Sequence, residues 1–333
     1  MLDASDVKRI NINRIRSVMW RGGEHTKQSV ARETGLSVAT CNTFLNEMEY
    51  SGEITSDKRQ LNGVGRSTGI YRINEAYESI LCIRIDLESD GHRILGFDVL
   101  SMLKTVLFHK NFCYKTLSKD AIQACTKEIL LQFPNISCIM VGTSGIVDHG
   151  VIQLSDIPEI ENMPLVELIQ KQAGEIPVYA AYDCQYRVYG AYKQAGYTTE
   201  TMTLFFCMKN ILPGTASIVH GRCVIGKNGF AGMNGYMPFD VSREELIKRI
   251  ADTHGLSYMV TMIASVITIL NPDEMIFGGN VVDQNMLEQI RARCEAVIPP
   301  KFLPVFRVVT DNECDYLEGM YQMALELKVN IEV

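Results

Sequence analysis

The sequence predicts a mixed α/β protein with a small, mainly helical module at its N-terminus. Two observations carry this prediction. Between Thr26 and Tyr50 the apolar residues recur at three- and four-residue spacings, which is typical of helices. From Ser79 onward, apolar strands alternate with amphipathic helices, as in α/β folds with helices on both faces of a sheet. A chain of 333 residues, 47% of them hydrophobic, can bury the cores of two or three domains. We therefore place one domain at residues 1–75 and another at 76–333.

The first segment predicts two short helices joined by a tight turn. Thr26 caps the first helix, Gly35 supplies the left-handed residue that ends it, and Ser37 caps the second. Ala31 is small where the two helices would cross, and an earlier helix at about 7–20 would cover the pair. This is the helix-turn-helix arrangement.

The outward face of the second helix carries small, uncharged side chains, which suit a helix lying in the major groove of DNA. The following segment, 52–74, alternates like a hairpin with a glycine- and arginine-containing tip, and such a wing would bring cations to the phosphates or the minor groove. A helical hairpin for protein contacts is the alternative, but four separate features favour a DNA-binding winged module. The predicted DNA contacts are Lys27, Ser37, Val38, Thr40, Asn42, Thr43, Asn46, Arg59 and Arg66.

Charge and composition agree with this division. Residues 1–74 hold 11 Lys/Arg and 8 Asp/Glu, whereas the remainder holds 21 and 31. The N-terminus lacks an apolar signal-peptide core, and the most apolar helical run, 259–270, is too short to span a bilayer. The ten cysteines form no C-x-x-C pair. We expect a cytoplasmic protein with reduced cysteines, no metal site and no membrane contact.

The order of elements and several motifs resemble the ROK family of repressors, open reading frames and sugar kinases. The resemblance covers nearly the whole chain and implies an actin-like ATPase fold in two lobes, here roughly 76–185 and 186–333. The segments that carry it are "TGLSVAT", "GVGRST", "VGTSGIVDHGVI", "PVYAAYDCQ", "GKNGFAGMNGYM" and "LNPDEMIFGGN".

The nucleotide-binding motifs of that family are altered here. Where its kinases have an Asp-x-Gly-Gly-Thr phosphate loop, this chain keeps Asp86 but places Glu88 and Ser89 at the glycine positions. Side chains there block the approach of phosphates to backbone N–H groups, and added carboxylates repel a triphosphate. The second phosphate loop keeps only Gly214, and the adenosine-side glycines remain at 278–279. We predict no ATP binding, no cofactor and no catalytic residue.

The sugar-binding positions have changed as well. The family's Asn, Glu and His correspond to Tyr182, Met233 and Tyr236. Only about 35 residues separate Tyr236 from Asn271, so the family's cysteine-rich zinc loop is absent from the sequence. Asp183 remains, and the resemblance implies a general base at this position in the kinases. The residues themselves predict a helix cap instead, with contact to a sugar hydroxyl left open.

The predicted effector contacts are Asp183, Tyr182, Asn234 and Tyr236. The tyrosines at 182, 186, 189 and 236 fit either a stacking surface for a sugar ring or core packing, and the sequence leaves both open.

Together these features predict a sequence-specific transcriptional regulator that binds double-stranded DNA, and the resemblance implies a repressor of sugar-related genes. We expect a homodimer, because winged helices usually read paired half-sites. The inactive kinase-like module would serve dimerisation and the sensing of a sugar or sugar phosphate, for which a coupling of about 1–3 kcal/mol is enough. One alternative is an active sugar kinase with an appended DNA-binding domain; another is a regulator without a small-molecule ligand.

Overall fold

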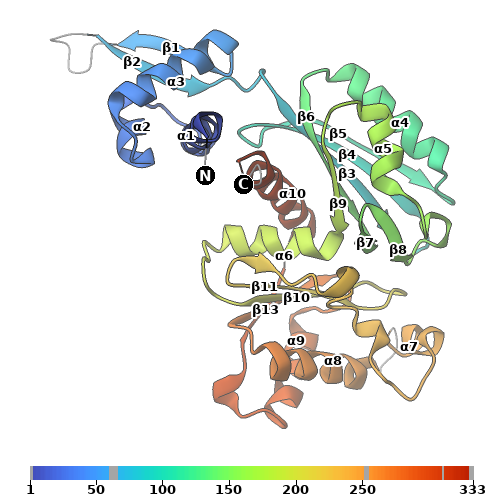
Figure 1. Ribbon diagram of the computed structural model, residues 1–333. Coiled ribbons are helices and arrows are strands. Elements are labelled where there is room, and N and C mark those ends of the chain that lie inside the picture. Colours follow the sequence, from blue (N-terminus) through green and yellow to red (C-terminus); the bar gives the residue numbers. More distant parts are fainter. Residues whose placement is uncertain (1–2, 60–66, 251–254, 310, 330–333) are drawn as a thin grey trace.

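The computed structural model describes residues 3–59, 67–250, 255–309 and 311–329, and shows an N-terminal module beside two sheet-centred lobes (Figure 1). The N-terminal module contains α1 (Ala4–Met19), α2 (Lys27–Thr34), α3 (Val38–Ser51), β1 (Ile54–Arg59) and β2 (Thr68–Ile73). The first lobe contains β3 (Ser79–Leu87), β4 (Arg93–Ser101), β5 (Val106–Tyr114), α4 (Lys119–Gln132), β6 (Ile136–Thr143), β7 (Gly145–Asp148), β8 (Val151–Ser155), α5 (Leu165–Ala173) and β9 (Val178–Tyr182). The second lobe contains β10 (Met202–Cys207), β11 (Gly214–Val219), β12 (Arg222–Cys223), α7 (Arg243–Ile250), α8 (Gly255–Leu270), β13 (Glu274–Gly279), α9 (Gln284–Glu295) and β14 (Val305–Val308). Two further helices, α6 (Asp183–Gln194) and α10 (Asn312–Val329), follow the last strand of each lobe.

In the N-terminal module, α2 and α3 begin and end where the sequence predicts. The side-chain oxygens of Thr26 and Ser37 each accept a hydrogen bond, both at 3.0 Å, from the amide three residues later. Between the helices Gly35 takes a φ of 71°, a conformation that glycine adopts without steric cost. The hairpin of β1 and β2 follows, and its predicted tip, including Arg66, lies outside the described residues.

The sheet of the first lobe has the order β5-β4-β3-β6-β9. Strands β5, β4 and β3 are antiparallel neighbours, β6 runs parallel to β3, and β9 runs parallel to β6. Successive side chains of a strand point to opposite faces. Along β3, Leu81 and Ile83 pack with α4 and α5, whereas Ile80 and Cys82 pack with α10 and the N-terminal module. Burial of both faces explains why this strand is an almost unbroken apolar run.

The second lobe repeats this topology. Its sheet has the order β12-β11-β10-β13-β14, with an antiparallel trio followed by two strands parallel to β10 and β13. Helices α7, α8 and α9 cover the face of the sheet that carries Phe205 and Phe277, and α6 covers the other face. Within the described residues no single helix is long and apolar enough to cross a bilayer, although the bent pair α7 and α8 passes that test by length and composition.

Helices α6 and α10 cross between the two sheets (Figure 1). A Cβ on Gly190 would lie 1.9 Å from the carbonyl oxygen of Asp315, and a Cβ on Gly319 would lie 1.8 Å from that of Tyr186. Glycine is therefore required at both positions for the backbones to approach this closely. At its far end α10 reaches α1, where Asn13 Nδ2 donates to the carbonyl oxygen of Val329 at 2.8 Å.

Candidate functional site

The outward face of α3 is exposed as the sequence predicts. Ser37, Val38, Thr43 and Asn46 are exposed and Thr40 is half-buried. The opposite face supplies the core through Cys41, Phe44, Leu45 and Met48. This face of α3 contains no Lys or Arg, so its contacts with DNA would be hydrogen bonds and apolar contacts to base edges.

Lys27 is connected to this face. It is the first residue of α2, and its Nζ donates a hydrogen bond to Oδ1 of Asn42, which is half-buried on α3. Because Lys27 Nζ binds Oδ1, this bond sets the orientation of the Asn42 amide NH₂ group. Two of the predicted DNA contacts therefore form one unit, which the sequence did not indicate.

The cations of the β1–β2 hairpin are paired within the module. Arg59 Nη1 lies 3.0 Å from both carboxylate oxygens of Glu24, and Arg72 binds Glu24 and Asp57 as well. The hydrogen bond from Arg72 lowers the pKa of Glu24, so the carboxylate stays ionised. A phosphate contact by Arg59 would have to compete with Glu24.

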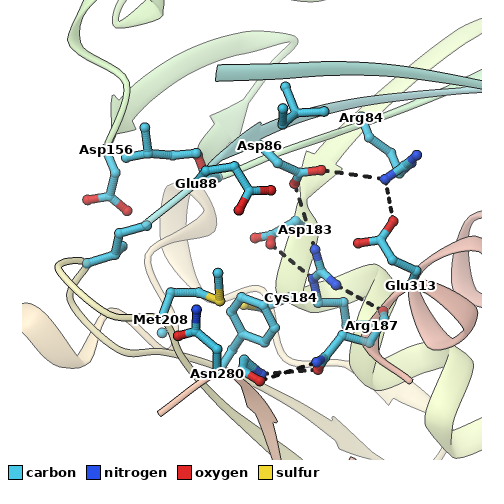
Figure 2. A pocket seen from close by; sticks show the side chains of 18 of the residues that line it. Arg84, Asp86, Glu88, Asp156, Asp183, Cys184, Arg187, Met208, Asn280 and Glu313 are labelled. Atoms are coloured by element: carbon cyan, nitrogen blue, oxygen red, sulfur yellow. Dashed lines mark hydrogen bonds and ion pairs between the residues drawn. The ribbon is translucent and has the colours of Figure 1, made fainter. Parts of the chain in front are cut away.

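A cavity of about 620 Å³ lies between the two lobes, where the ends of β3, β10 and β13 meet the first turns of α6 and α10 (Figure 2). Its described lining includes six Asp or Glu residues and two arginines, together with apolar side chains such as Ile94, Phe206 and Leu212. The cavity therefore carries an excess of negative charge. We refer to it as the interlobe cleft.

Arg187 lies at the centre of the cleft's ionic contacts (Figure 2). It is buried, and its Nε lies 3.2 Å from Asp183 Oδ2 while its Nη2 lies 3.7 Å from Asp86 Oδ1. Its Nη1 donates to the carbonyl oxygen of Asn312 at 2.9 Å, and the guanidinium stacks 4.1 Å from the ring centroid of Tyr316. Arg187 thus pairs with both Asp86 and Asp183, the two carboxylates that this chain shares with the kinase motifs of the family.

A second arginine connects the first lobe with α10. Arg84 on β3 is buried, and its Nε donates to Asp98 Oδ2 at 3.0 Å. Its Nη1 lies 3.8 Å from Asp86 and also bonds Glu313 at the start of α10 (Figure 2). This contact therefore connects β3 with the first turn of α10, 229 positions later in the chain.

Burial sets the protonation of these groups. Loss of hydration raises the pKa of Asp86 to about 7, although Arg187 and Arg84 oppose the shift. Burial also raises the pKa of Asp183, again against Arg187. The pKa of Arg187 rises further above its usual range, because the carboxylates outweigh the cost of burying its charge. At neutral pH the network therefore holds a cation beside carboxylates, of which Asp86 is close to protonation.

The backbone positions that could cradle phosphates are occupied by side chains of the chain itself. A Cβ on Gly214 would lie 1.8 Å from Tyr182 Oη, so the tyrosine hydroxyl already covers this glycine. The amide of Gly279 donates to Asn312 Oδ1 at 3.1 Å. Between β3 and β4, Glu88 lines the cleft where a phosphate loop would need glycine.

The polar end of the cleft continues into a smaller cavity of about 230 Å³, lined in part by Asp156, Glu161, Arg243, Tyr182 and Tyr236. The Arg243 guanidinium lies 4.1 Å from the ring centroid of Tyr236. Loss of hydration in the cleft raises the pKa of Asp156 to about 6, and the charge of Arg243 opposes this shift. The Asp156 side chain nevertheless remains accessible to water. Asp156, Glu161 and Arg243 were not predicted: the first two lie in a loop and the third begins α7, and nothing but their charge marks them in the sequence.

The predicted effector residues do not all meet in this space. Tyr182 lines both parts of the cleft, Asp183 lines the larger part, and Tyr236 lines the smaller part. Asn234 lines neither: it is buried and faces a separate groove on the second lobe. The structure places Tyr186 and Tyr189 in the core and so decides between the two roles left open for them.

The predicted capping role of Asp183 is wrong in its main point. The residue that precedes α6 is Tyr182, and Asp183 is the first residue inside the helix. Its carboxylate turns into the cleft and pairs with Arg187 one turn later, since side chains four residues apart share a helix face. The amide of Cys184 contributes only a further bond to the carboxylate.

Within the described ranges, no group of three or more His, Cys, Asp or Glu side chains is arranged to hold a metal ion. The segment after Tyr236, where the family's zinc loop would follow, forms α7 and α8.

Comparison with known proteins confirms the resemblance seen in the motifs. The ROK family model matches residues 109–247. No curated protein sequence matches the chain.

Solved structures confirm the fold. A ROK family transcriptional regulator, a homologue of the E. coli MLC protein, superposes with a TM-score of 0.69 at 16% identity, covering 97% of this chain and 99% of that one. The ROK hexokinase from Thermus thermophilus gives 0.58 at 15% identity, covering 75% and 99%. The glucokinase from Streptomyces griseus, in complex with glucose and AMPPNP, gives 0.56 at 13% identity, covering 74% and 99%.

Proposed function

We propose that this protein is a sequence-specific DNA-binding regulator, a repressor of sugar-related genes, whose kinase-like lobes bind an effector but do not transfer phosphate. The main support for DNA binding is the exposed, uncharged face of α3 on a capped helix pair. The similar regulator covers 97% of the chain, N-terminal module included, whereas the hexokinase covers 75%. On this proposal residues 1–75 are the DNA-binding domain and 76–333 the regulatory domain.

The observation that carries the loss of kinase activity is the position of Arg187. A phosphoryl-transfer enzyme needs a free carboxylate beside the acceptor hydroxyl and room for a metal-bound triphosphate. Here Asp86 and Asp183 are both paired with a buried arginine, and the Gly214 and Gly279 backbones are covered. The remaining excess of carboxylates would repel a triphosphate.

The same charge distribution favours an uncharged sugar over a sugar phosphate as effector. The smaller, polar part of the cleft offers carboxylates, an arginine and two tyrosines, which suit hydroxyl groups and the face of a sugar ring. A phosphate placed in the larger part would meet Glu88, Asp86 and Asp183.

Helix α10 supports a route from the cleft to the DNA-binding module. Its first turn carries Asn312 and Glu313, which bind Arg187 and Arg84 in the cleft, and its last residue contacts Asn13 on α1. A sugar that changes the closure of the lobes would move α10 and with it α1. In a homodimer this movement would alter the spacing of the two α3 helices.

The test uses the full chain and two assays. DNA selected from a random pool is measured by fluorescence anisotropy with the wild type, with Asn42→Ala and, as a distant surface control, with Arg291→Ala. The proposal expects a selected consensus, loss of discrimination in Asn42→Ala, and wild-type behaviour in Arg291→Ala. Absence of any enriched sequence would refute the regulator.

The second assay addresses the alternative of an active sugar kinase, which the retention of Asp183 and the similarity to kinase structures favour. ADP release is followed with ATP, magnesium and a panel of hexoses and amino sugars. The proposal expects no turnover above the enzyme-free blank. Turnover that disappears in Asp183→Asn would establish the kinase instead.

A further inference from the structure

A second groove lies on the second lobe, outside the interlobe cleft. It has a volume of about 410 Å³ and is formed by β11, the loop between β12 and α7, and the last turns of α8. None of the described residues that line it is charged, in contrast to the interlobe cleft. Its apolar lining includes Ala216, Phe230, Met237, Val266, Ile269 and Leu270.

One polar side chain at this groove lacks a partner. Asn234 is only 6% exposed, and its Nδ2 has no hydrogen-bond partner in the part of the chain that the structure describes. Its Oδ1 receives only a long 3.5 Å contact from the Thr215 hydroxyl, which also bonds the carbonyl oxygen of Gly232 at 3.1 Å. A buried amide N–H without an acceptor is costly, and such groups in folded proteins are usually satisfied by a partner.

We propose that this groove binds an uncharged, largely apolar small molecule that places a carbonyl oxygen against Asn234 Nδ2. The volume falls within the range of small-molecule sites, which are mostly apolar with a few placed polar groups. An ionised ligand is excluded because the described lining supplies no counter-charge to offset its loss of hydration.

The groove shares a wall with the polar end of the interlobe cleft. Met233 and Tyr236 line both spaces, and Asn234 lies between them in a single three-residue turn. A molecule in the groove would contact one side of the segment 233–236, and an effector in the cleft would contact the other side. The site stands apart from the proposed regulator function, because its occupancy can be measured without DNA or sugar.

The experiment uses neutral aryl-alkyl ketones, beginning with 4-phenylbutan-2-one, each paired with the carboxylate of the same skeleton, 4-phenylbutyrate in that case. Binding to the full chain is measured by saturation-transfer NMR titration. Ser265→Trp fills the groove from α8, since Ser265 lines it and its hydroxyl bonds only its own helix at Thr261. Thr268→Trp is the matched control on the same helix: Thr268 is exposed and outside the lining, and its hydroxyl also bonds the helix backbone.

We expect saturable binding of the ketones to the wild type and to Thr268→Trp, and a loss of at least tenfold in affinity in Ser265→Trp. The carboxylates should bind at least tenfold more weakly than the ketones, and Asn234→Leu should reduce the affinity for the ketones. Equal binding of both members of a pair, or unchanged binding in Ser265→Trp, would overturn the proposal.

Ile269 at the rim of the groove is 80% exposed. Because an exposed apolar side chain can pack against another protein surface, a second copy of the chain is the competing occupant. Analytical ultracentrifugation of the same variants separates the two. A dimer that dissociates in Ser265→Trp, with no ketone binding to the wild type, would assign the groove to self-association and refute the small-molecule site. Unchanged mass in all variants, together with ketone binding, supports it.

Discussion

The N-terminal module and the interlobe cleft use their polar side chains in opposite ways. On α3 the uncharged polar residues are exposed or half-buried, and the hairpin arginines Arg59 and Arg72 pair with Glu24 and Asp57 at the surface. In the cleft most of the charged residues are buried, and Arg187 on α6 and Arg84 on β3 pair there with the carboxylates of Asp86, Asp98 and Asp183. The first arrangement leaves hydrogen-bonding groups available to a partner, whereas the second uses them to hold the protein together. On the proposed function, α3 is the surface that contacts DNA, whereas the charges of the cleft stabilise the fold.

Removal of Arg187 should have the largest effect. Arg187→Met leaves the buried Asp183 carboxylate without its cation, so we expect the free energy of unfolding to fall by about 3–5 kcal/mol. Urea unfolding followed by circular dichroism measures it. Arg291→Met is the control, because Arg291 is 64% exposed in a pair with Glu295, and its loss should change stability by no more than about 0.5 kcal/mol. Equal effects of both variants would show that the cleft network is not structural.

The pH dependence of stability should reflect Asp86. Its pKa of about 7 in the folded protein lies above the ordinary value of 3.8, so the folded state binds the proton more tightly between these values. The free energy of unfolding should therefore fall as pH rises from about 4 to about 7, by at most about 1.4 kcal/mol per pH unit for this group. Asp86→Asn should flatten the profile in that window, and Asp57→Asn, at an exposed pair, should leave it unchanged. A wild-type slope that persists in Asp86→Asn would locate the titration elsewhere.

Discrimination among DNA sequences should depend on Asn42. Loss of its amide in Asn42→Ala should reduce discrimination at one base pair by about 1–3 kcal/mol, while binding to non-specific DNA changes little. Anisotropy titrations with single-base operator variants measure this effect. A uniform loss across all sequences would instead place Asn42 at the DNA backbone.

Lys27 should act both alone and through Asn42. Lys27→Ala should reduce the slope of log affinity against log salt by about 1, as expected for one lost phosphate contact. Because Lys27 also orients Asn42, the double variant should be non-additive by about 0.5 kcal/mol or more. Strict additivity in the cycle would mean that the bond between them has no role on DNA.

The smallest change should come from Glu24. Glu24→Gln releases Arg59 and Arg72 from their shared carboxylate, so affinity for all DNA sequences should rise modestly, and most clearly at low salt. Unchanged affinity would show that the hairpin cations do not face DNA.

Local signals in the sequence were sufficient for much of the fold. Thr26, Gly35 and Ser37 define the helix pair through bonds to neighbours within a few residues, and those are visible in the chain order. The central strands of both lobes appear as apolar runs because both faces of each sheet are buried there. The loss of phosphate-loop glycines at Glu88 and Ser89 is likewise readable without a structure.

The network in the cleft could not be predicted in this way. Arg187 meets Asp86, 101 positions earlier in the chain, and Arg84 meets Glu313 across 229 positions. Asp183 was interpreted as a cap because a carboxylate at the head of a helix has local partners, yet its side chain turned toward Arg187. Asn234 was predicted as an effector contact, but it lines a separate groove on the second lobe.

By itself the sequence determined the N-terminal helix pair and its caps, the alternation of strands and helices that follows, and which phosphate-binding residues are absent, since these depend on contacts between near neighbours. Only the tertiary structure decided which charges pair in the cleft, which side chains face each cavity, and how α10 connects the cleft with α1. Those features depend on the packing of two sheets around the α6–α10 crossing, which brings distant residues to within bonding distance.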